Sequence, residues 1–237
     1  MYRVSHVPAR HAWPGRHRLC RRHAGGRGLA GRQIVSPRPD MNEKRIQRIN
    51  SVVSLRQSGI IVVLEDIHDP HNAAAILRTC DAMGIQNVWL IFEKERPYNP
   101  KRIGKATSSS ANKWLDFQIF SSTSTCIKAL KKQKYDIVVT ALTARSISLE
   151  DYQNSDNKTA IIVGNEHRGV SDEMLAAADF VLKIPMLGFV QSLNVSVATA
   201  IILWEITKQR VLSDNPAVLK NKEQQTLLRD FMERAKK

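Results

Sequence analysis

The stretch Ile184-Pro-Met-Leu-Gly-Phe-Val-Gln-Ser-Leu-Asn-Val-Ser-Val-Ala198 decides how the rest of the chain is interpreted. Four polar residues lie here between the end of an apolar strand and the start of a strongly apolar helix: Gln191, Ser192, Asn194 and Ser196. A polar group that stays unpaired in such a buried position costs about 1–3 kcal/mol of stability. We therefore expect these side chains to meet a ligand, a neighbouring backbone, or both.

Outward from this stretch, short apolar runs alternate with segments of helical periodicity. The run 60–64 is continuously apolar, as expected of a parallel strand that is covered on both faces. Further strands are expected at 87–92, 136–140, 160–163 and 181–184, and helices at 42–56, 70–83, 126–132, 172–178, 195–209 and around 227–232. The segment 93–125 shows no clear period, and we expect a loop there with a short helix around 105–111. The alternation predicts an α/β fold with a mostly parallel sheet flanked by helices.

The 237 residues are enough for one α/β domain with extensions, and their net charge of +14 is unevenly distributed. Residues 1–40 contain nine Arg, no Lys and a single acid, whereas the remaining chain has 27 basic and 21 acidic residues. The remaining chain is therefore moderately basic, which fits a polyanionic partner.

Residues 1–40 differ from the rest of the chain because they are rich in Arg, Gly and Pro and have no apolar periodicity. Three interpretations fit this composition: a disordered basic tail, an Arg-rich transit peptide, or an upstream stretch translated from a misplaced start. Met41 opens an ordinary sequence, which favours the misplaced start. We expect no part of the fold to depend on residues 1–40.

The cysteines and the longest apolar stretch argue against several classes of protein. Cys20, Cys80 and Cys126 lie far apart and form no Cys-x-x-Cys or Cys/His spacing, so we expect neither a metal site nor a disulfide scaffold. Such cysteine usage suits the reducing cytosol, and we expect a cytoplasmic protein. The apolar stretch 195–206 is shorter than the roughly 20 residues that span a bilayer, so we expect no membrane segment.

Two further stretches carry residues suited to chemistry at the ends of strands, where ligands of open α/β sheets bind. They are His68-Asp-Pro-His-Asn72 with Arg78 six residues later, and Gly164-Asn-Glu166. The alternatives are structural: Arg78 in a surface ion pair, a plain turn at 164–166, and helix capping by the polar residues of the opening stretch. Neither phosphate-binding glycine fingerprint is present, and no Gly-x-Ser-x-Gly surrounds Ser192, which argues against a nucleotide-binding loop and a serine hydrolase.

Together and in this order, the three stretches resemble the three motifs of the SpoU/TrmH branch of the SPOUT RNA methyltransferases, over about residues 43–212. The resemblance implies an α/β sheet whose C-terminal segment forms a deep trefoil knot that holds S-adenosylmethionine. It also implies a homodimer with the active site assembled across the interface. The implied reaction is methylation of a ribose 2′-hydroxyl of RNA.

The resemblance also implies roles for individual residues of this sequence. Residues expected to contact the cofactor, largely through backbone, are Thr140, Gly164, Ile184, Ser192 and Leu193. Residues expected around the reacting ribose are Arg78, Asn72, Glu166, Ser192 and Asn194, with Glu166 orienting Arg78. Arg78 would activate the hydroxyl or, because a guanidinium stays protonated, clamp an RNA phosphate. Residues expected to contact RNA phosphates are Arg45, Arg48, Lys101, Arg102, Lys105 and Arg168.

The segments 45–49 and 64–72 look most like the tRNA-modifying members of this branch, which methylate the D-loop guanosine at position 18. The extension after residue 212 is short, so a ribosomal RNA or a tRNA anticodon position remains an alternative. A non-catalytic RNA-binding relative is a further alternative, and an unrelated nucleotide-binding domain lacks its glycine fingerprint. We expect a basic tail at 1–40, an N-terminal helix at 41–58, a methyltransferase domain at 59–212 and a helical extension at 213–237.

Overall fold

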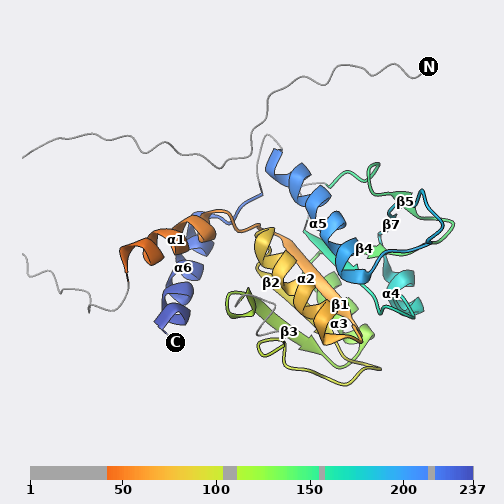
Figure 1. Ribbon diagram of the computed structural model, residues 1–237, viewed down its shortest axis with the longest axis horizontal. Coiled ribbons are helices and arrows are strands. Elements are labelled where there is room, and N and C mark those ends of the chain that lie inside the picture. Colours follow the sequence, from red (N-terminus) through yellow and green to blue (C-terminus); the bar gives the residue numbers. More distant parts are fainter. Residues whose placement is uncertain (1–41, 104–110, 155–157, 213–216, 237) are drawn as a thin grey trace, which may run out of the picture. The chain divides into compact units, whose positions relative to one another are not determined.

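The computed structural model describes residues 42–103, 111–154, 158–212 and 217–236 (Figure 1). The chain divides into the units Met1–Pro39 and Asp40–Lys237, and all described residues belong to the second unit. The expected basic tail, the RNA contact Lys105 and most of the short helix expected at 105–111 lie outside the described residues. Only a 3-10 turn at Ala111–Lys113 is described beside them.

The centre of the second unit is a seven-stranded sheet in which every neighbouring pair is parallel. The strands are β1 (Ile60–Glu65), β2 (Asn87–Ile91), β3 (Asp116–Phe120), β4 (Asp136–Thr140), β5 (Ile147–Ser148), β6 (Thr159–Val163) and β7 (Phe180–Lys183). Their order across the sheet is β3-β2-β1-β6-β4-β7-β5. This confirms the prediction of an α/β fold with a parallel sheet flanked by helices.

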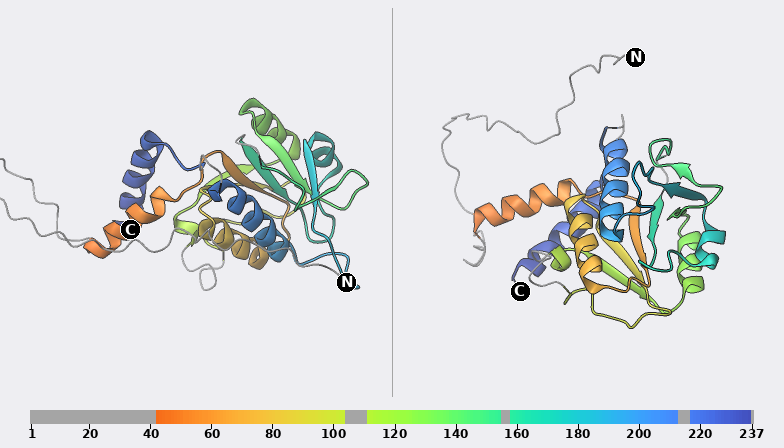
Figure 2. Two further views of the ribbon diagram at one scale, coloured as in Figure 1. Left: turned by 90° about the horizontal axis from the view of Figure 1, so that it is seen from above. Right: turned by 45° about the vertical axis from the view of Figure 1, so that its right-hand side comes forward.

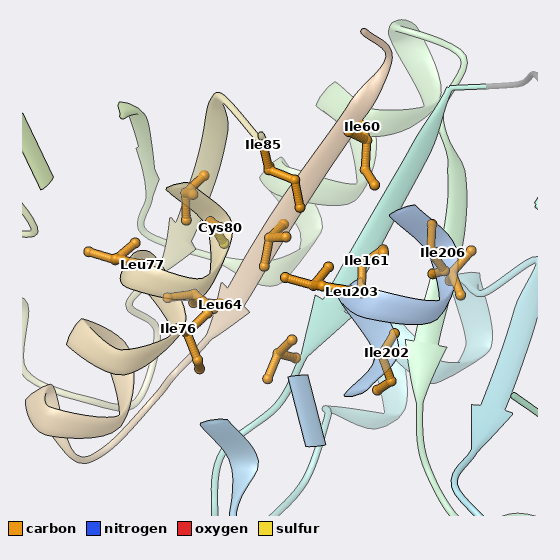
Figure 3. Close-up of a cluster of buried hydrophobic side chains, with 14 of the residues drawn as sticks. Ile60, Leu64, Ile76, Leu77, Cys80, Ile85, Ile161, Ile202, Leu203 and Ile206 are labelled. Atoms are coloured by element: carbon orange, nitrogen blue, oxygen red, sulfur yellow. The ribbon is translucent and has the colours of Figure 1, made fainter. Parts of the chain in front are cut away.

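Helices cover both faces of the sheet (Figure 2). On one face lie α2 (Pro70–Ala82) and α5 (Val195–Leu212), and on the other lie α3 (Thr123–Lys132) and α4 (Asp172–Ala177). Alternate residues of β1 serve the two sides: Ile60 and Leu64 pack with α2 and α5, whereas Ile61 packs with α3 and α4. The first cluster is drawn in Figure 3, where Ile76 of α2 and Ile202 of α5 point toward the central strands.

Two strands were missed by the sequence analysis, for identifiable reasons. β3 lies at the edge of the sheet and its five side chains are half-buried or exposed, so it shows no apolar run. β5 has two residues and pairs only with β7 at the opposite edge. The helix expected at 126–132 begins earlier, at Thr123, because the Ser122 side chain caps its first turn by accepting the N–H of Thr125.

The termini of the helices on the site side follow the expected chemistry. Asp69 caps α2 by accepting the N–H of His71, and Pro70 occupies the first helical position, where its missing N–H costs nothing. Gly84 has a φ of +75°, which an L-residue rarely adopts, and ends this segment as predicted.

The first and last helices pack against each other on a small separate core. They are α1 (Glu43–Ser54) and α6 (Asn221–Lys236), and the core consists of Ile49, Val53, Leu227, Phe231 and Ala235. Arg56 follows α1 and is fully buried; its guanidinium bonds to Asp81 at 2.5 Å and to the carbonyl of Ile85 at 3.1 Å. The expected boundaries at 58 and 212 remain a prediction, as does the trefoil knot.

No helix within the described residues combines the length and apolar character needed to cross a membrane. The longest apolar helix, α5, has 18 residues and is apolar on more than one side.

Candidate active site

The carboxyl ends of β1, β4, β6 and β7 lie at one edge of the sheet, because all strands run in the same direction. Segments at this edge enclose a cavity of about 460 Å³. Its lining residues come from 140–142 after β4, 164–170 after β6, 182–186 at the end of β7, and 191–202 at the start of α5. The volume lies in the range of about 300–1,000 Å³ that is usual for small-molecule sites.

All five residues expected to contact the cofactor line this cavity: Thr140, Gly164, Ile184, Ser192 and Leu193. They come from all four of these segments, so their meeting is a property of the fold. Leu142, Leu182 and Ile202 add apolar side chains to the same walls. The cavity therefore offers backbone groups and an apolar surface.

Gly164 is required by a close approach of two backbone segments. A Cβ built on Gly164 would lie 2.4 Å from the carbonyl carbon of Gly169 and 2.4 Å from the nitrogen of Val170. Any side chain at position 164 would push this turn away from the end of β6. Glycine, which has no Cβ, permits this close approach of two backbone segments.

The turn after β6 is held by Asn165, which is buried. Its main chain exchanges two 2.9 Å hydrogen bonds with Gly169, and its Oδ1 accepts the N–H groups of His167 and Arg168. Its Nδ2 donates to the carbonyl of Asp66 at 2.7 Å. Asn165 thus fixes the turn that carries Glu166 and Arg168 to the end of β1.

Glu166, Asn72 and Asn194 form one hydrogen-bonded cluster at the rim of the cavity. Asn72 Nδ2 donates to Glu166 Oε1 at 2.9 Å, and Asn194 Nδ2 donates to Asn72 Oδ1 at 3.1 Å. The backbone N–H groups of His68 and Asp69 donate to the same carboxylate at 2.9 and 3.2 Å. The structure therefore brings together one residue from each of the three sequence motifs.

The pKa of Glu166 reflects two opposing effects. Partial burial raises it, but the hydrogen bonds from Asn72 and from the N–H groups of His68 and Asp69 outweigh burial and lower it overall. Glu166 is therefore a carboxylate at neutral pH, held in one orientation by three donors.

The polar residues of the opening stretch are less buried than the sequence suggested. Asn194 Oδ1 accepts the N–H and the hydroxyl of Ser196, at 2.8 and 2.6 Å, and so fixes the first turn of α5. Gln191 and Ser192 are exposed and line the open cavity, where water satisfies polar groups at little cost. Gln191 and Ser192 therefore contribute to the cavity, whereas Asn194 both caps α5 and contributes to the site.

Arg78 occupies a different position from the cluster. It lies on the exposed side of α2, and the described residues that line the cavity do not include it. The hydrogen bonds described for Glu166 come from Asn72 and two backbone groups. The expected orientation of Arg78 by Glu166 remains a prediction.

The expected RNA contacts lie in three places. Arg45 and Arg48 are exposed on α1, and Lys101 and Arg102 are exposed in the turn after Asn99. Arg168 lines the cavity, with its guanidinium 2.7 Å from a carboxylate oxygen of Glu95.

Sequence reasoning assigned no role to Glu95, Asp66 or Asn165, although Asn165 lies in the stretch Gly164-Asn-Glu166. Asp66 and Asn165 directly follow β1 and β6, so a polar residue at a strand end was an available signal. Glu95 offered no such signal, because it lies in the segment without periodicity. Among the described residues, no three His, Cys, Asp or Glu side chains gather as a metal site requires.

Comparison with known proteins identifies relatives of this chain. The model of the SpoU rRNA Methylase family matches residues 59–204. A tRNA (guanosine(18)-2′-O)-methyltransferase of Thermus thermophilus is 40% identical over 182 residues, which cover 75% of this chain and 90% of that protein. The enzyme of the same name from Escherichia coli K12 is 35% identical over 193 residues, which cover 79% and 82%.

Solved structures show a similar fold. The crystal structure of the Aquifex aeolicus TrmH/SpoU tRNA modifying enzyme superposes with a TM-score of 0.71 at 33% identity, covering 80% of this chain and 95% of that one. An RNA 2′-O ribose methyltransferase superposes with a TM-score of 0.57 at 29% identity, covering 66% and 59%. The family model spans the sheet, the cavity and all three motifs, and the chain belongs to the SpoU rRNA methylase family.

Proposed function

We propose that this protein transfers the methyl group of S-adenosylmethionine to the ribose 2′-hydroxyl of guanosine 18 in the D-loop of tRNA. The observation that carries the proposal is the position of the polar cluster at the rim of the cavity. Glu166 and Asn194 line the cavity, and both are bonded to Asn72. The relatives from Thermus thermophilus and Escherichia coli, which the chain matches over most of their length, are named for this reaction.

The cavity suits S-adenosylmethionine as the methyl donor. Leu142, Leu182 and Ile202 provide an apolar wall for an adenine ring, and backbone at 140–142 and 182–184 provides hydrogen-bonding groups. S-adenosylmethionine has no phosphate, so the missing glycine-rich phosphate loop is no obstacle. When bound, it supplies an electrophilic methyl group on a positively charged sulfur.

The polar cluster orients the acceptor in this proposal. A ribose hydroxyl is weakly acidic, so the protein must align it with the methyl donor and favour loss of its proton. Asn194 and Asn72 present amide groups at the rim, and the ionised Glu166 holds Asn72 in place. Arg78 serves as a phosphate clamp, because a guanidinium is permanently charged and matches two phosphate oxygens.

The site is completed by a second copy of the chain. The outer side of α5 exposes Val197, Ile201 and Trp204, which recur at helical spacing and are 47%, 38% and 41% exposed. Leu187 and Phe189 in the preceding segment are fully exposed. An apolar surface of this extent is typical of an interface, and it adjoins the first turn of α5 beside the cavity. In this proposal the second copy docks on this face and supplies its Arg78 to the cluster.

Methyl transfer to defined RNAs tests the reaction. The protein is incubated with S-adenosylmethionine labelled on the methyl group and an unmodified tRNA transcript, and the labelled nucleotide is mapped. Label is expected at guanosine 18, and none is expected on a transcript with 2′-deoxyguanosine at that position. Label found only in ribosomal RNA or in the anticodon loop contradicts guanosine 18 as the substrate. Cofactor binding without transfer to any RNA contradicts the proposed methyltransferase activity.

Variants separate the roles of the arginine and the interface. Arg78→Ala is expected to abolish transfer while cofactor affinity stays within about twofold, whereas Arg229→Ala, an exposed arginine on α6, retains transfer. Ile201→Lys is expected to give a monomer in light scattering, because it places a charge in the apolar face. Leu55→Lys changes an exposed apolar residue after α1, 54% exposed against 38% for Ile201, and serves as the control. A wild-type monomer with full activity contradicts the interface.

A further inference from the structure

A single carboxylate bridges two exposed basic side chains next to the polar cluster. Glu95 Oε2 lies 2.9 Å from His68 Nδ1, and Glu95 Oε1 accepts a hydrogen bond from Arg168 Nη2 at 2.7 Å. The side chains of His68 and Arg168 are 60% and 47% exposed, whereas that of Glu95 is 17% exposed. Two solvent-facing donors thus converge on one anion that belongs to the chain itself.

The position of Glu95 is fixed by the backbone before it. Asp66 Oδ1 accepts the N–H groups of Glu93, Lys94 and Glu95 at 2.8, 3.0 and 3.1 Å. Asp66 is buried and has a φ of +51°, a backbone conformation that needs such anchoring. The segment after β2 is therefore built to hold Glu95 between the two cations.

The charges of the bridge support one another. The hydrogen bond and the charge of Glu95 raise the pKa of His68; Glu166 adds to this effect, and Arg168 and desolvation oppose it. The hydrogen bonds from His68 and Arg168 lower the pKa of Glu95. The ring of His167 lies edge-on to that of His68, with 6.0 Å between the ring centroids. The direction of this shift favours the protonated form of the His68 ring, which suits an anion that bridges two basic groups.

Both cations lie beside groups that the proposed reaction uses. The N–H of His68 donates to Glu166, and Arg168 lines the cavity two residues after Glu166. An anion held between His68 and Arg168 therefore sits next to the Asn72–Glu166 pair. When a ribose of an RNA strand reaches that pair, the phosphates on its 5′ and 3′ sides lie next to the pair.

A phosphodiester and a carboxylate present the same chemistry to these donors. Each offers two oxygens that share a negative charge, and arginine binds both kinds of group with the same planar donor geometry. Exposed ion pairs contribute little stability, so exchanging Glu95 for a phosphate costs little. RNA binding also releases counterions from the phosphate, which favours the exchange.

We propose that His68 and Arg168 form a binding subsite for an RNA phosphodiester, and that Glu95 occupies this subsite until RNA binds. The inference rests on the proposed RNA methyltransferase function. It assigns His68 and Glu95 roles in substrate binding in addition to that of Arg168, and it makes Glu95 a competitor of the substrate.

RNA affinity of Glu95→Gln tests the exchange directly. Binding of a fluorescently labelled tRNA transcript to the full chain is measured by anisotropy, without cofactor, at pH 7.5. Glu95→Gln is expected to bind about two- to fivefold more tightly, because the competing charge is gone. Glu93→Gln is the matched control: it removes the same charge two residues earlier, from a carboxylate that accepts the N–H of Thr123 at 2.7 Å.

Arg168→Ala and His68→Ala test the two donors. Each is expected to weaken RNA binding, and Arg168→Ala is expected to reduce the slope of log affinity against log salt by about one. In the background of Arg168→Ala, Glu95→Gln is expected to lose most of its effect. Thermal unfolding of each variant within a few degrees of wild type shows that the fold is retained.

Three outcomes overturn the inference. Weaker RNA binding by Glu95→Gln makes Glu95 a positioning residue for Arg168. Equal gains in Glu95→Gln and Glu93→Gln reduce the effect to long-range charge. A changed affinity for S-adenosylmethionine in Glu95→Gln, with RNA affinity unaltered, assigns the subsite to the cofactor carboxylate. Methyl transfer by the wild-type protein to the same transcript is scored separately, so failure of the proposed function is recognised independently.

Discussion

Replacing Gly164 with alanine is expected to damage cofactor binding and stability together. The new Cβ would lie 2.4 Å from the carbonyl carbon of Gly169 and from the nitrogen of Val170, and 2.6 Å from the Gly169 oxygen. Ordinary carbon contacts are about 3.5–4.0 Å, so the turn must move by about 1 Å. All three atoms belong to backbone, which has no rotamer to relieve the contact. The turn also carries Glu166 and Arg168.

The size of the effect follows from this required movement. Inserting a methyl group that forces a backbone shift costs about 1–3 kcal/mol, and this loss is expected in the free energy of unfolding. The moved turn forms one wall of the cavity, so affinity for S-adenosylmethionine is expected to fall at least about tenfold. Conformational preference contributes nothing, because Gly164 is absent from the glycines with positive φ.

Two measurements and one matched variant decide this prediction. Urea unfolding gives the stability, and isothermal titration with S-adenosylmethionine gives the affinity. Gly188→Ala is the control: Gly188 lies in the segment between β7 and α5, and a Cβ built there meets nothing within 4 Å. If Gly164→Ala matches Gly188→Ala in both measurements, the close backbone approach has no energetic role and the steric reasoning is refuted.

Three further predictions concern the polar cluster and the buried arginine. Asn72→Ala is expected to lower kcat about 10- to 100-fold with cofactor affinity nearly unchanged, because it removes the bridge between Glu166 and Asn194; steady-state kinetics with tRNA check this. Arg56→Ala is expected to cost about 3 kcal/mol in urea unfolding, whereas exposed Arg48→Ala stays within about 0.5 kcal/mol. The pKa of Glu166 is lowered by folding, so its stabilising contribution is complete above the unfolded pKa and is lost as the pH falls through the folded value. The stability difference between wild type and Glu166→Gln is therefore expected to shrink between pH 7 and pH 3, and a constant difference contradicts this.

The central strands and the caps of the helices could be predicted because their signals are local. The apolar run of β1 requires cover on both faces, and Asp69-Pro70 has the cap and first-position chemistry of a helix start. β3 could not be found in this way, since an edge strand with exposed side chains has no apolar pattern. β3 is defined by its pairing with β2, and that pairing joins residues far apart in the sequence.

The site shows the same division between local and distant information. The need for glycine at position 164 could be read from its place after a strand, but the backbone that requires it belongs to Gly169 and Val170. From the resemblance, Glu166 was expected to orient Arg78, and no local signal pointed to its bond with Asn72, which lies 94 residues away. The backbone geometry at the start of α2 selects Asn72, whose side chain leaves the helix end toward β6. The Glu95 bridge depends on Asp66, and their meeting follows only from the pairing of β1 with β2.

Asn194 couples the proposed interface to the proposed chemistry. Its Oδ1 holds the first turn of α5 through Ser196, and its Nδ2 donates to Asn72. The amide cannot rotate without breaking both sets of bonds, so any cover that rigidifies the start of α5 also holds Asn72 against Glu166. The outer face of that helix, with Val197 at its first turn, is where we place the second copy.

Dimer formation and methyl transfer are then linked, by mass action, to protein concentration. Specific activity is expected to fall on dilution through the dimer dissociation constant, which light scattering or sedimentation measures independently. Ile201→Lys is expected to show the low specific activity at all concentrations, whereas Leu55→Lys follows the wild-type curve. Dissociation of the dimer can lower activity in two ways: the second Arg78 is lost, or Asn194 is held less firmly. The two ways differ in their effect on cofactor affinity. Loss of Arg78 alone leaves cofactor affinity unchanged on dilution, whereas loosening of the 191–195 segment weakens it, because that segment lines the cavity. A specific activity that stays constant across the dissociation would rule out both effects and place the whole site within one chain.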